Sequence, residues 1–334
     1  MKQANVWRAA VLGVGVLIAL APFVVDAVRG KEIPIPATVE AVAKAVRSRF
    51  ADGDCVVVRP AWFSSVLTRL TDMGRGTEAW PFEALMGSED LDPLALGTCA
   101  HLWWIDFLGR RTGPAPLTLD EVLSAEPLPL LDPEVAVRAA VTRFEPRPLT
   151  RYRTLSRGLE KAEIYRGARG ADGVKCRYRG DRHRCETDPW LDVRLEGRHV
   201  GHHEVYWPYV HPGPGDQDLR IVWPPDAAVL RAGGDPAWLI VRMGHSMEAV
   251  RHAEGTEVSV EIRIDGTLMD TVTLAPRRWE LVHRVFPVAP GAAWPTVEFR
   301  IHTDDPNWRE TLLDADFTDR VPAAYISGDG SPRP

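Results

Sequence analysis

Residues 257–274, EVSVEIRIDGTLMDTVTL, constrain the fold more than any other stretch of the chain. Between Val258 and Ile264 apolar and polar residues alternate, which leaves one face of an extended strand apolar and the other polar. Asp265 and Gly266 follow, and this dipeptide favours the positive φ angles of a tight hairpin turn. The sequence therefore predicts an antiparallel hairpin that buries one of its faces.

Short segments of the same character run through the C-terminal half of the chain, separated by Gly, Pro or Asp. The predicted strands are 190–195, 202–206, 219–223, 238–243, 258–264, 268–274, 280–287 and 296–302. Regularly punctuated short strands are typical of a two-sheet architecture. We therefore predict an antiparallel jelly-roll β-sandwich over residues 160–320, followed by a disordered tail, 321–334.

The N-terminus carries an uncharged apolar run, residues 9–25, preceded by Lys2 and Arg8. Its 17 residues are near the short limit for a membrane span. An uncleaved anchor, a signal peptide cleaved after Ala21 and a buried helix are the alternatives, and Pro22 disfavours cleavage. We expect residues 1–36 to anchor the protein in the lipid bilayer. Because basic residues precede the run, a single-pass protein of the bacterial inner membrane is predicted, with its bulk extracytoplasmic or periplasmic.

Four cysteines agree with an oxidising compartment. Cys176 and Cys185 bracket the segment KCRYRGDRHRC, whose Gly180-Asp181 pair can turn the chain so that the two thiols meet. Cys55 begins one predicted strand and Cys99 precedes another, which allows a second disulfide. One cysteine pair with His183 offers too few ligands for zinc.

Residues 37–146 contain a helix pattern at 37–50, a strand at 55–58, a helix at 61–73 and further strands at 101–107 and 135–144. This order predicts a small, Rossmann-like α/β domain with a partly parallel sheet, so the predicted fold class is α+β multidomain. The turn after the first strand, Arg59 to Trp62, lacks the glycines of a phosphate-binding loop. Nucleotide binding is therefore not expected.

The connector between the predicted domains is basic. Residues 147–184, which include the linker 147–159, contain twelve Lys or Arg and four acidic residues, in a chain whose net charge is −6. Such a segment suits anionic headgroups or acidic glycans, and the alternative is a solvated connector with one helix at 155–165. The acidic chain as a whole argues against nucleic acid as a partner.

Aromatic side chains near polar groups are the candidate ligand-binding residues, since sugar rings stack on flat apolar surfaces. The candidates are Trp207, Tyr209, Trp308, Asp304, Asp305, Asn307 and Arg309. No pair of carboxylates stands out for glycoside hydrolysis, so no catalytic residue is predicted.

Metal ligands are considered in two places. The first is a histidine group with one glutamate, although neighbouring residues on a strand point to opposite faces: His199, His202, His203, His211 and Glu204. The second is a set of aspartates that would suit a structural Ca²⁺: Asp304, Asp305, Asp314 and Asp316. No other cofactor is expected.

The segments GDCVVVRPAW and AHLWWIDFLGR, the cysteine-bracketed turn and VEFRIHTDDPNWRE occur in this order. With the apolar run before them, residues 37–318 resemble the extracytoplasmic tail of bacterial multi-span, lipid-dependent glycosyltransferases. Those enzymes hold their catalytic carboxylates in membrane-embedded loops, which a chain with one span lacks. The resemblance thus implies envelope glycan chemistry without the transferase activity.

The sandwich separately resembles carbohydrate-binding modules in its architecture, and fold alone does not give function. The leading hypothesis is a non-catalytic, membrane-anchored envelope protein whose sandwich binds glycan or a glycan-assembling membrane partner. The alternatives are a membrane-tethered enzyme acting on envelope saccharides, glycosyltransferase-related or a glycoside hydrolase, and a structural scaffold.

Overall fold

The computed structural model describes residues 36–51, 53–59, 93–107, 121–130, 139–185, 192–200, 203–213, 215–225, 237–252, 254–289, 293–305, 307 and 309–326. The predicted membrane segment 9–25, the predicted helix 61–73, His202 and Trp308 lie outside these residues. All statements below refer to the described part of the chain.

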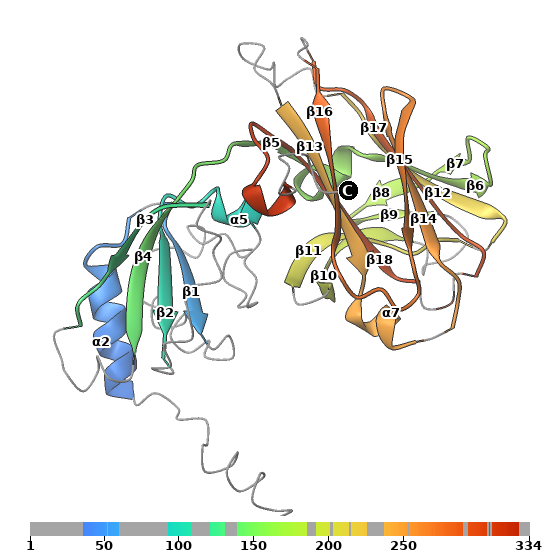
Figure 1. The fold of residues 1–334 in the computed structure, drawn as a ribbon. Helices are drawn as coiled ribbons and strands as arrows, with labels where there is room; N and C mark the ends of the chain where they lie inside the picture. Colours follow the sequence, from blue (N-terminus) through green and yellow to red (C-terminus); the bar gives the residue numbers. More distant parts are fainter. Residues whose placement is uncertain are drawn as a thin grey trace, which may run out of the picture.

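The N-terminal part is a four-stranded sheet covered on one face by a helix (Figure 1). Its strands are β1 (Cys55–Arg59), β2 (Leu102–Asp106), β3 (Val122–Pro127) and β4 (Ala140–Pro146), in the order β1-β2-β4-β3. Helix α2 (Pro36–Arg47) buries four residues at helical spacing against alternate residues of β1 and β2. The other face of the sheet carries Cys55, which forms a disulfide with Cys99 after helix α5 (Pro93–Leu96).

The predicted Rossmann-like domain is wrong. Strands β1 and β2 are parallel, but β2–β4 and β3–β4 are antiparallel. A Rossmann-like sheet requires successive parallel strands joined by helical crossovers. Here β3, which ends at Pro127, and β4, which begins at Ala140, are antiparallel neighbours, so the sheet is mixed.

The expected transmembrane helix and inner-membrane location are also not supported. No helix within the described ranges is long and apolar enough to cross a bilayer. The longest described helix, α2, has 12 residues and an exposed polar face.

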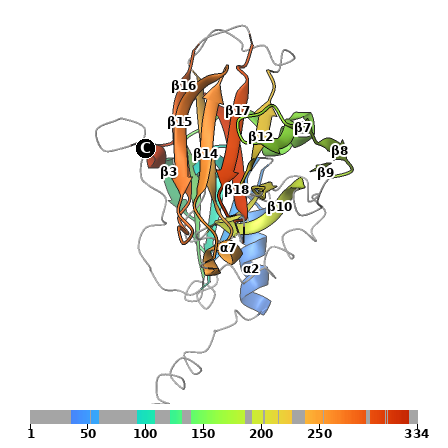
Figure 2. The same ribbon diagram turned by 90° about the vertical axis from the view of Figure 1, so that its right-hand side faces the viewer.

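The C-terminal part consists of two antiparallel sheets packed face to face, so it is a β-sandwich (Figures 1 and 2). One sheet has the order β16-β13-β18-β11-β10-β9-β8, and β5 also pairs with β18. Its strands are β5 (Arg151–Thr154), β8 (Arg177–Arg179), β9 (Arg182–Arg184), β10 (Val193–Val200), β11 (His203–Val210), β13 (Ala237–His245), β16 (Val282–Val288) and β18 (Thr311–Thr318).

The second sheet has the order β15-β14-β17-β12-β6-β7. Its strands are β6 (Glu163–Ala168), β7 (Val174–Lys175), β12 (Gln217–Trp223), β14 (Val258–Ile264), β15 (Thr267–Leu274) and β17 (Val297–Thr303). Figure 2 shows β15, β14 and β17 side by side. The predicted hairpin is confirmed, because β14 pairs with β15 around Asp265 and Gly266, whose φ angles are +47° and +79°.

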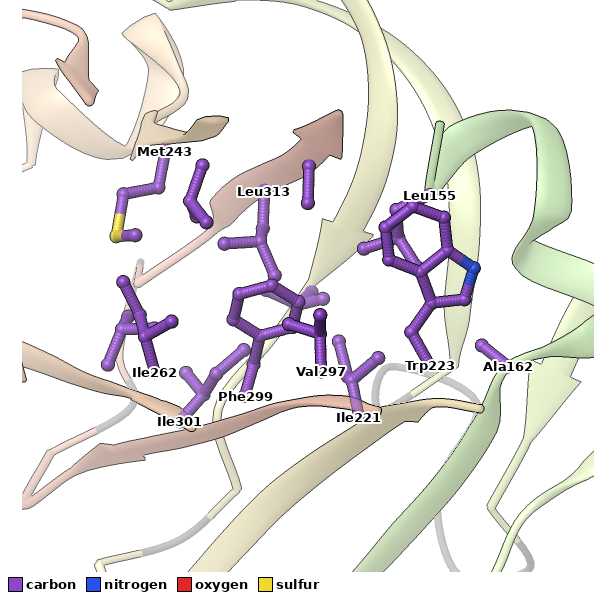
Figure 3. Close-up of a cluster of buried hydrophobic side chains, with 14 of the residues drawn as sticks. Leu155, Ala162, Ile221, Trp223, Met243, Ile262, Val297, Phe299, Ile301 and Leu313 are labelled. Atoms are coloured by element: carbon purple, nitrogen blue, oxygen red, sulfur yellow. The ribbon is translucent and has the colours of Figure 1, made fainter. Parts of the chain in front are cut away.

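Alternate residues from both sheets fill the core between them (Figure 3). Phe299 and Ile262 from the six-stranded sheet point towards Leu313 and Met243 from the eight-stranded sheet, and each is fully buried. Because successive side chains on a strand point to opposite faces, the residues between them lie on the outer faces of the sandwich. The outer faces are therefore the places to look for a binding site.

Several elements differ from the sequence expectation, among them residues 155–165 and strand β18. Residues 155–165 were expected to be helical, but they form the short 3-10 helix η3 (Ser156–Lys161) and the start of β6. Strand β18 was not expected at all, although all eight of its residues are buried. Asp314 and Asp316 interrupt its apolar pattern, and they lie in the structure beside Arg242 of β13.

Candidate anion-binding face

The ligand-binding residues expected from sequence lie on different elements. Asp304 is exposed at the end of β17, and Asn307 is exposed in the following loop, where its side chain bonds Asp305 at 2.7 Å. Arg309 is fully buried and donates to the carbonyl of Pro276 at 3.3 Å. Trp207 and Tyr209 belong to β11, in the other sheet. Ligand contact by these residues stays a prediction.

Trp207 and Tyr209 are covered by arginine side chains. The guanidinium of Arg242 lies 4.5 Å from the centre of the Trp207 ring, and that of Arg194 lies 4.6 Å from the Tyr209 ring. The exposed fractions of the two aromatic residues are only 4% and 2%. Burial raises the pKa of the Tyr209 hydroxyl above its ordinary value, with a hydrogen bond to Glu310 acting in the same direction. Neither ring offers a sugar an open stacking surface.

The four aspartates expected to bind Ca²⁺ do not form one cluster. Asp314 and Asp316 are buried, and both accept hydrogen bonds from Arg242. Asp304 instead contacts His302 at 3.1 Å, at the end of the six-stranded sheet. Among the described side chains, no group of three or more His, Cys, Asp or Glu residues is arranged to hold a metal ion. Of the histidine group, His199 is exposed and the Nδ1 atom of His211 contacts the Pro212 carbonyl.

A polar cluster that sequence reasoning missed lies where β1 and β2 begin. The buried carboxylate of Asp54 contacts the Nδ1 atom of His101 at 2.8 Å and accepts from the Trp103 indole at 2.9 Å. Arg143 donates to the Nε2 atom of His101 at 2.8 Å. This arrangement places the ring proton on Nδ1 and leaves both ring nitrogens engaged, so the cluster ties β1, β2 and β4 together.

The clearest functional candidate is formed by the hairpin β8–β9 and the neighbouring strand β10. Cys176, His183 and Cys185 point towards the core and are almost fully buried. The residues that alternate with them are all arginines, and they point to the outer face. With the outward arginines of β10 they form a surface that we call the arginine face: Arg177, Arg179, Arg182, Arg184, Arg194 and Arg198.

The strand register places these arginines directly opposite one another. Arg177 faces Arg184, and Arg179 faces Arg182, across the hairpin. Arg182 in turn faces Arg194 on β10. Like charges that lie opposite on neighbouring strands destabilise a sheet. The opposed arginines of this face therefore destabilise the sheet that carries them.

Few carboxylates compensate this charge. Asp181 pairs with Arg182 at 2.8 Å, and Glu196 pairs with Arg194 at 2.7 Å and with Arg198. Glu248 also pairs with Arg198, at 3.2 Å, so three carboxylates face six arginines. Arg179 and Arg184 are exposed and have no ion-pair partner among the residues that the structure describes. The arginine face therefore keeps a net positive charge in a protein that is acidic overall.

The outer face of the six-stranded sheet differs in this respect. There Arg263 pairs with Glu261 at 2.9 Å, Arg300 pairs with Glu298, and Lys175 pairs with Glu163 at 2.6 Å. Cations and carboxylates alternate over that face, so its charges are compensated locally. Only the arginine face concentrates one sign of charge within the described sandwich strands.

The Cys176–Cys185 disulfide joins the ends of the β8–β9 hairpin, and its two Cα atoms are 4.3 Å apart. Beneath it His183 donates from Nε2 to the carbonyl of Leu159 at 2.7 Å. Burial lowers the pKa of His183, so the imidazole stays neutral and adds no further positive charge. Both predicted disulfides are confirmed.

The disulfide is expected to hold the hairpin in its register against the repulsion between arginines. Replacing both Cys176 and Cys185 with serine should lower the free energy of unfolding by about 2–3 kcal/mol, the value for a loop of this length. Denaturant unfolding of both proteins measures the difference. An unchanged stability would show that the hairpin keeps its register without the covalent link.

Sequence reasoning found the arginine-rich segment but not this face. The alternation Arg-x-Arg on both sides of Gly180 was the available signal, because it predicts arginines on one face of a hairpin. The contribution of Arg194 and Arg198 was not available, since it depends on the pairing of β9 with β10.

Comparisons with known proteins give a partial likeness. No family model matches the sequence, and no curated protein matches it. Among solved structures, the chain is similar to a CBM51 module of a Clostridium perfringens GH95 protein in complex with methyl-galactose, with 12% identity and a TM-score of 0.26, over 37% of this chain and 79% of that one. A family 35 carbohydrate-binding module from Clostridium thermocellum gives 11% identity and a TM-score of 0.24, over 52% and 98% of the two chains.

Tandem CBM51 modules of a family 98 glycoside hydrolase from Streptococcus pneumoniae give 13% identity and a TM-score of 0.26, over 38% of this chain and 36% of that one. These three solved structures are carbohydrate-binding modules. None of these three is a glycosyltransferase, so the predicted glycosyltransferase likeness finds no support in them. At these identities and TM-scores, the ligands of those modules do not carry over to this chain.

Proposed function

We propose that this protein is a non-catalytic binding protein whose β-sandwich binds an acidic glycan through the arginine face. The observation that supports the proposal is the register of arginine opposite arginine on β8, β9 and β10. Like charges that lie opposite one another lower the stability of the sheet. A bound polyanion raises the stability again, because it neutralises these charges.

The chemistry of arginine fits such a ligand. The guanidinium group presents five N–H donors in a planar fork, which matches the oxygens of carboxylate and sulfate groups. Arg194 and Arg182 each use only part of this capacity in their ion pairs with Glu196 and Asp181. A row of arginines spread over three neighbouring strands also suits an extended polymer better than a small compact molecule.

An enzymatic role finds less support. Glycoside hydrolysis needs two carboxyl groups that face each other across the scissile bond. The closely spaced carboxylates of Asp314 and Asp316 lie inside the protein, where both bind Arg242. Both carboxylates therefore have a structural role.

Binding to immobilised polysaccharides tests the proposal with the full chain. Polygalacturonate and dextran sulfate supply carboxylate and sulfate groups, dextran is the neutral control, and single-stranded DNA represents a polyanion that is not a glycan. We expect binding to the acidic polysaccharides and not to dextran, and we expect the affinity to fall as salt is added.

The double substitution Arg179→Ser and Arg184→Ser should weaken this binding at least about tenfold, since two charge-assisted hydrogen bonds are lost. The matched control is Arg277→Ser with Arg278→Ser, because both arginines are exposed in the turn between β15 and β16, at the opposite end of the strand order. An equal loss in the control, or tighter binding of DNA than of either acidic polysaccharide, would overturn the proposal.

A further inference from the structure

We infer that the glycan crosses strands β8 to β10 at right angles and carries an acidic group on each successive sugar. This inference rests on the proposed function and adds the direction of the chain and the spacing of its charges. It starts from a row of residues that are register partners on neighbouring strands.

The row consists of Arg179 on β8, Arg182 on β9 and Arg194 on β10. Tyr209 on β11 continues it, because it is the register partner of Arg194. Neighbouring strands are about 4.8 Å apart, so the row presents one guanidinium group at roughly this interval. One sugar residue advances an extended pyranose chain by a similar distance.

The direction along the strands is much less favourable. On β10 the outward residues are Arg194, Glu196 and Arg198, so a polyanion that followed this strand would meet a carboxylate between two arginines. On β8 only Arg177 and Arg179 are available, and residues two apart on one strand are separated by about 7 Å. The row across the strands is the one direction in which three successive register partners are all cations. The carboxylate of Asp181 pairs with the central one, Arg182, but belongs to the turn between β8 and β9 and is not a member of the row.

The row has one closed end. Arg194 is held over the ring of Tyr209, which is 2% exposed, and Leu312 on β18 beside it is fully buried. At the other end β8 is the last strand of the sheet, and Arg179 is exposed there. A chain therefore reaches the row from the β8 edge, and three acidic sugars fill it. A glycan with an acidic group on every second sugar would place no acidic group at Arg182.

Two polymers that contain uronic acid distinguish a ligand with an acidic group on every sugar from one with an acidic group on every second sugar. Polygalacturonate has a carboxylate on every sugar, and hyaluronate has one on every second sugar. The affinities are measured with the full chain at equal uronate concentration. We expect polygalacturonate to bind at least about tenfold more tightly than hyaluronate, because it makes one additional charge-assisted contact.

Single substitutions test which arginines belong to the row. Arg182→Ser, at its centre, should remove the preference for polygalacturonate, whereas Arg177→Ser, on the same hairpin outside the row, should weaken both polymers equally. Arg182→Ser removes two opposed pairs of arginines and Arg177→Ser removes one, so neither should lower the midpoint of thermal unfolding. Arg182→Lys keeps the charge and should retain part of the preference.

The outcomes are distinguishable from failure of the proposed function. Equal binding of the two polymers, or equal effects of Arg182→Ser and Arg177→Ser, would overturn the row while leaving acidic glycan binding in place. Absence of binding to both polymers would overturn the proposed function itself.

Discussion

Replacing Arg242 with methionine is expected to lower the free energy of unfolding by about 3–5 kcal/mol, the range for breaking one side of a buried ion pair. The Arg242 side chain is 1% exposed, and its Nη2 atom donates to Asp314 at 3.2 Å and to Asp316 at 2.8 Å. Methionine would keep much of the packing against Trp207. It would leave two buried carboxylates with Arg151 as their remaining ion-pair partner among the described residues.

Urea unfolding of the full chain measures this loss. The matched control is Arg263→Met on β14, whose partly exposed pair with Glu261 should contribute less than about 1 kcal/mol. Adding Asp314→Asn and Asp316→Asn to the Arg242→Met variant should recover part of the lost stability, because the unpaired charges are then removed. Similar losses for Arg242→Met and Arg263→Met would contradict the assignment of Arg242 as the central cation of the network.

The stability of the protein is expected to fall as the pH rises from about 4 to about 7, through the ionisation of Asp314. Burial raises the pKa of this carboxyl group from its ordinary 3.8 to about 7, and the neighbouring Asp316 carboxylate acts in the same direction. Below pH 4 the group is protonated in both the folded and the unfolded state. Between the two pKa values the unfolded state loses its proton while the folded state keeps it, so unfolding is favoured increasingly.

The size of this loss is on the order of 4 kcal/mol, at about 1.4 kcal/mol for each pKa unit. Asp314→Asn removes the titrating group, while the amide oxygen can still accept from the Ser156 N–H that now bonds the carboxylate at 2.9 Å. The free energies of unfolding of both proteins are measured between pH 4 and pH 8. As the pH rises, the variant should become increasingly more stable than the wild-type protein. Parallel curves would contradict a raised pKa at Asp314.

The eight-stranded sheet thus uses arginine in two opposite ways. Arg242 is buried and shared by two carboxylates, so its loss would leave their charges buried without this cation. Arg179 and Arg184 are exposed and opposed by other arginines, so they destabilise the hairpin that carries them. Sites at which local stability is given up are the places where function is expected.

The strands of the sandwich could be predicted because their signal is local. Strand β14 was predicted with its observed bounds, since Val258, Val260 and Ile262 alternate with polar residues that remain outside the core. Strand β18 could not be predicted, because Asp314 and Asp316 interrupt its apolar pattern. The residue that makes their burial tolerable, Arg242, is about 70 positions earlier in the chain.

Among the candidate site residues, the outcome depended on the surroundings of each side chain. Trp207 and Tyr209 have the chemistry of sugar-binding residues, but Arg242 and Arg194 cover them in the folded sheet. Arg309 was a candidate ligand-binding residue, but its side chain is fully buried. Residue type alone did not reveal these contacts, because they join segments that are distant in the sequence.

By itself, the sequence determined which residues share a face of each strand, because the alternation of side chains is a property of a single extended segment. That alternation already placed arginines on one side of the β8–β9 hairpin and cysteines on the other. The two-residue turn Gly180-Asp181 likewise sets Arg179 opposite Arg182, because a short turn fixes the register of its own hairpin. Only the tertiary structure decided that Arg182 also lies opposite Arg194. The register between β9 and β10 results from the packing of the whole core, and no single segment contains that information.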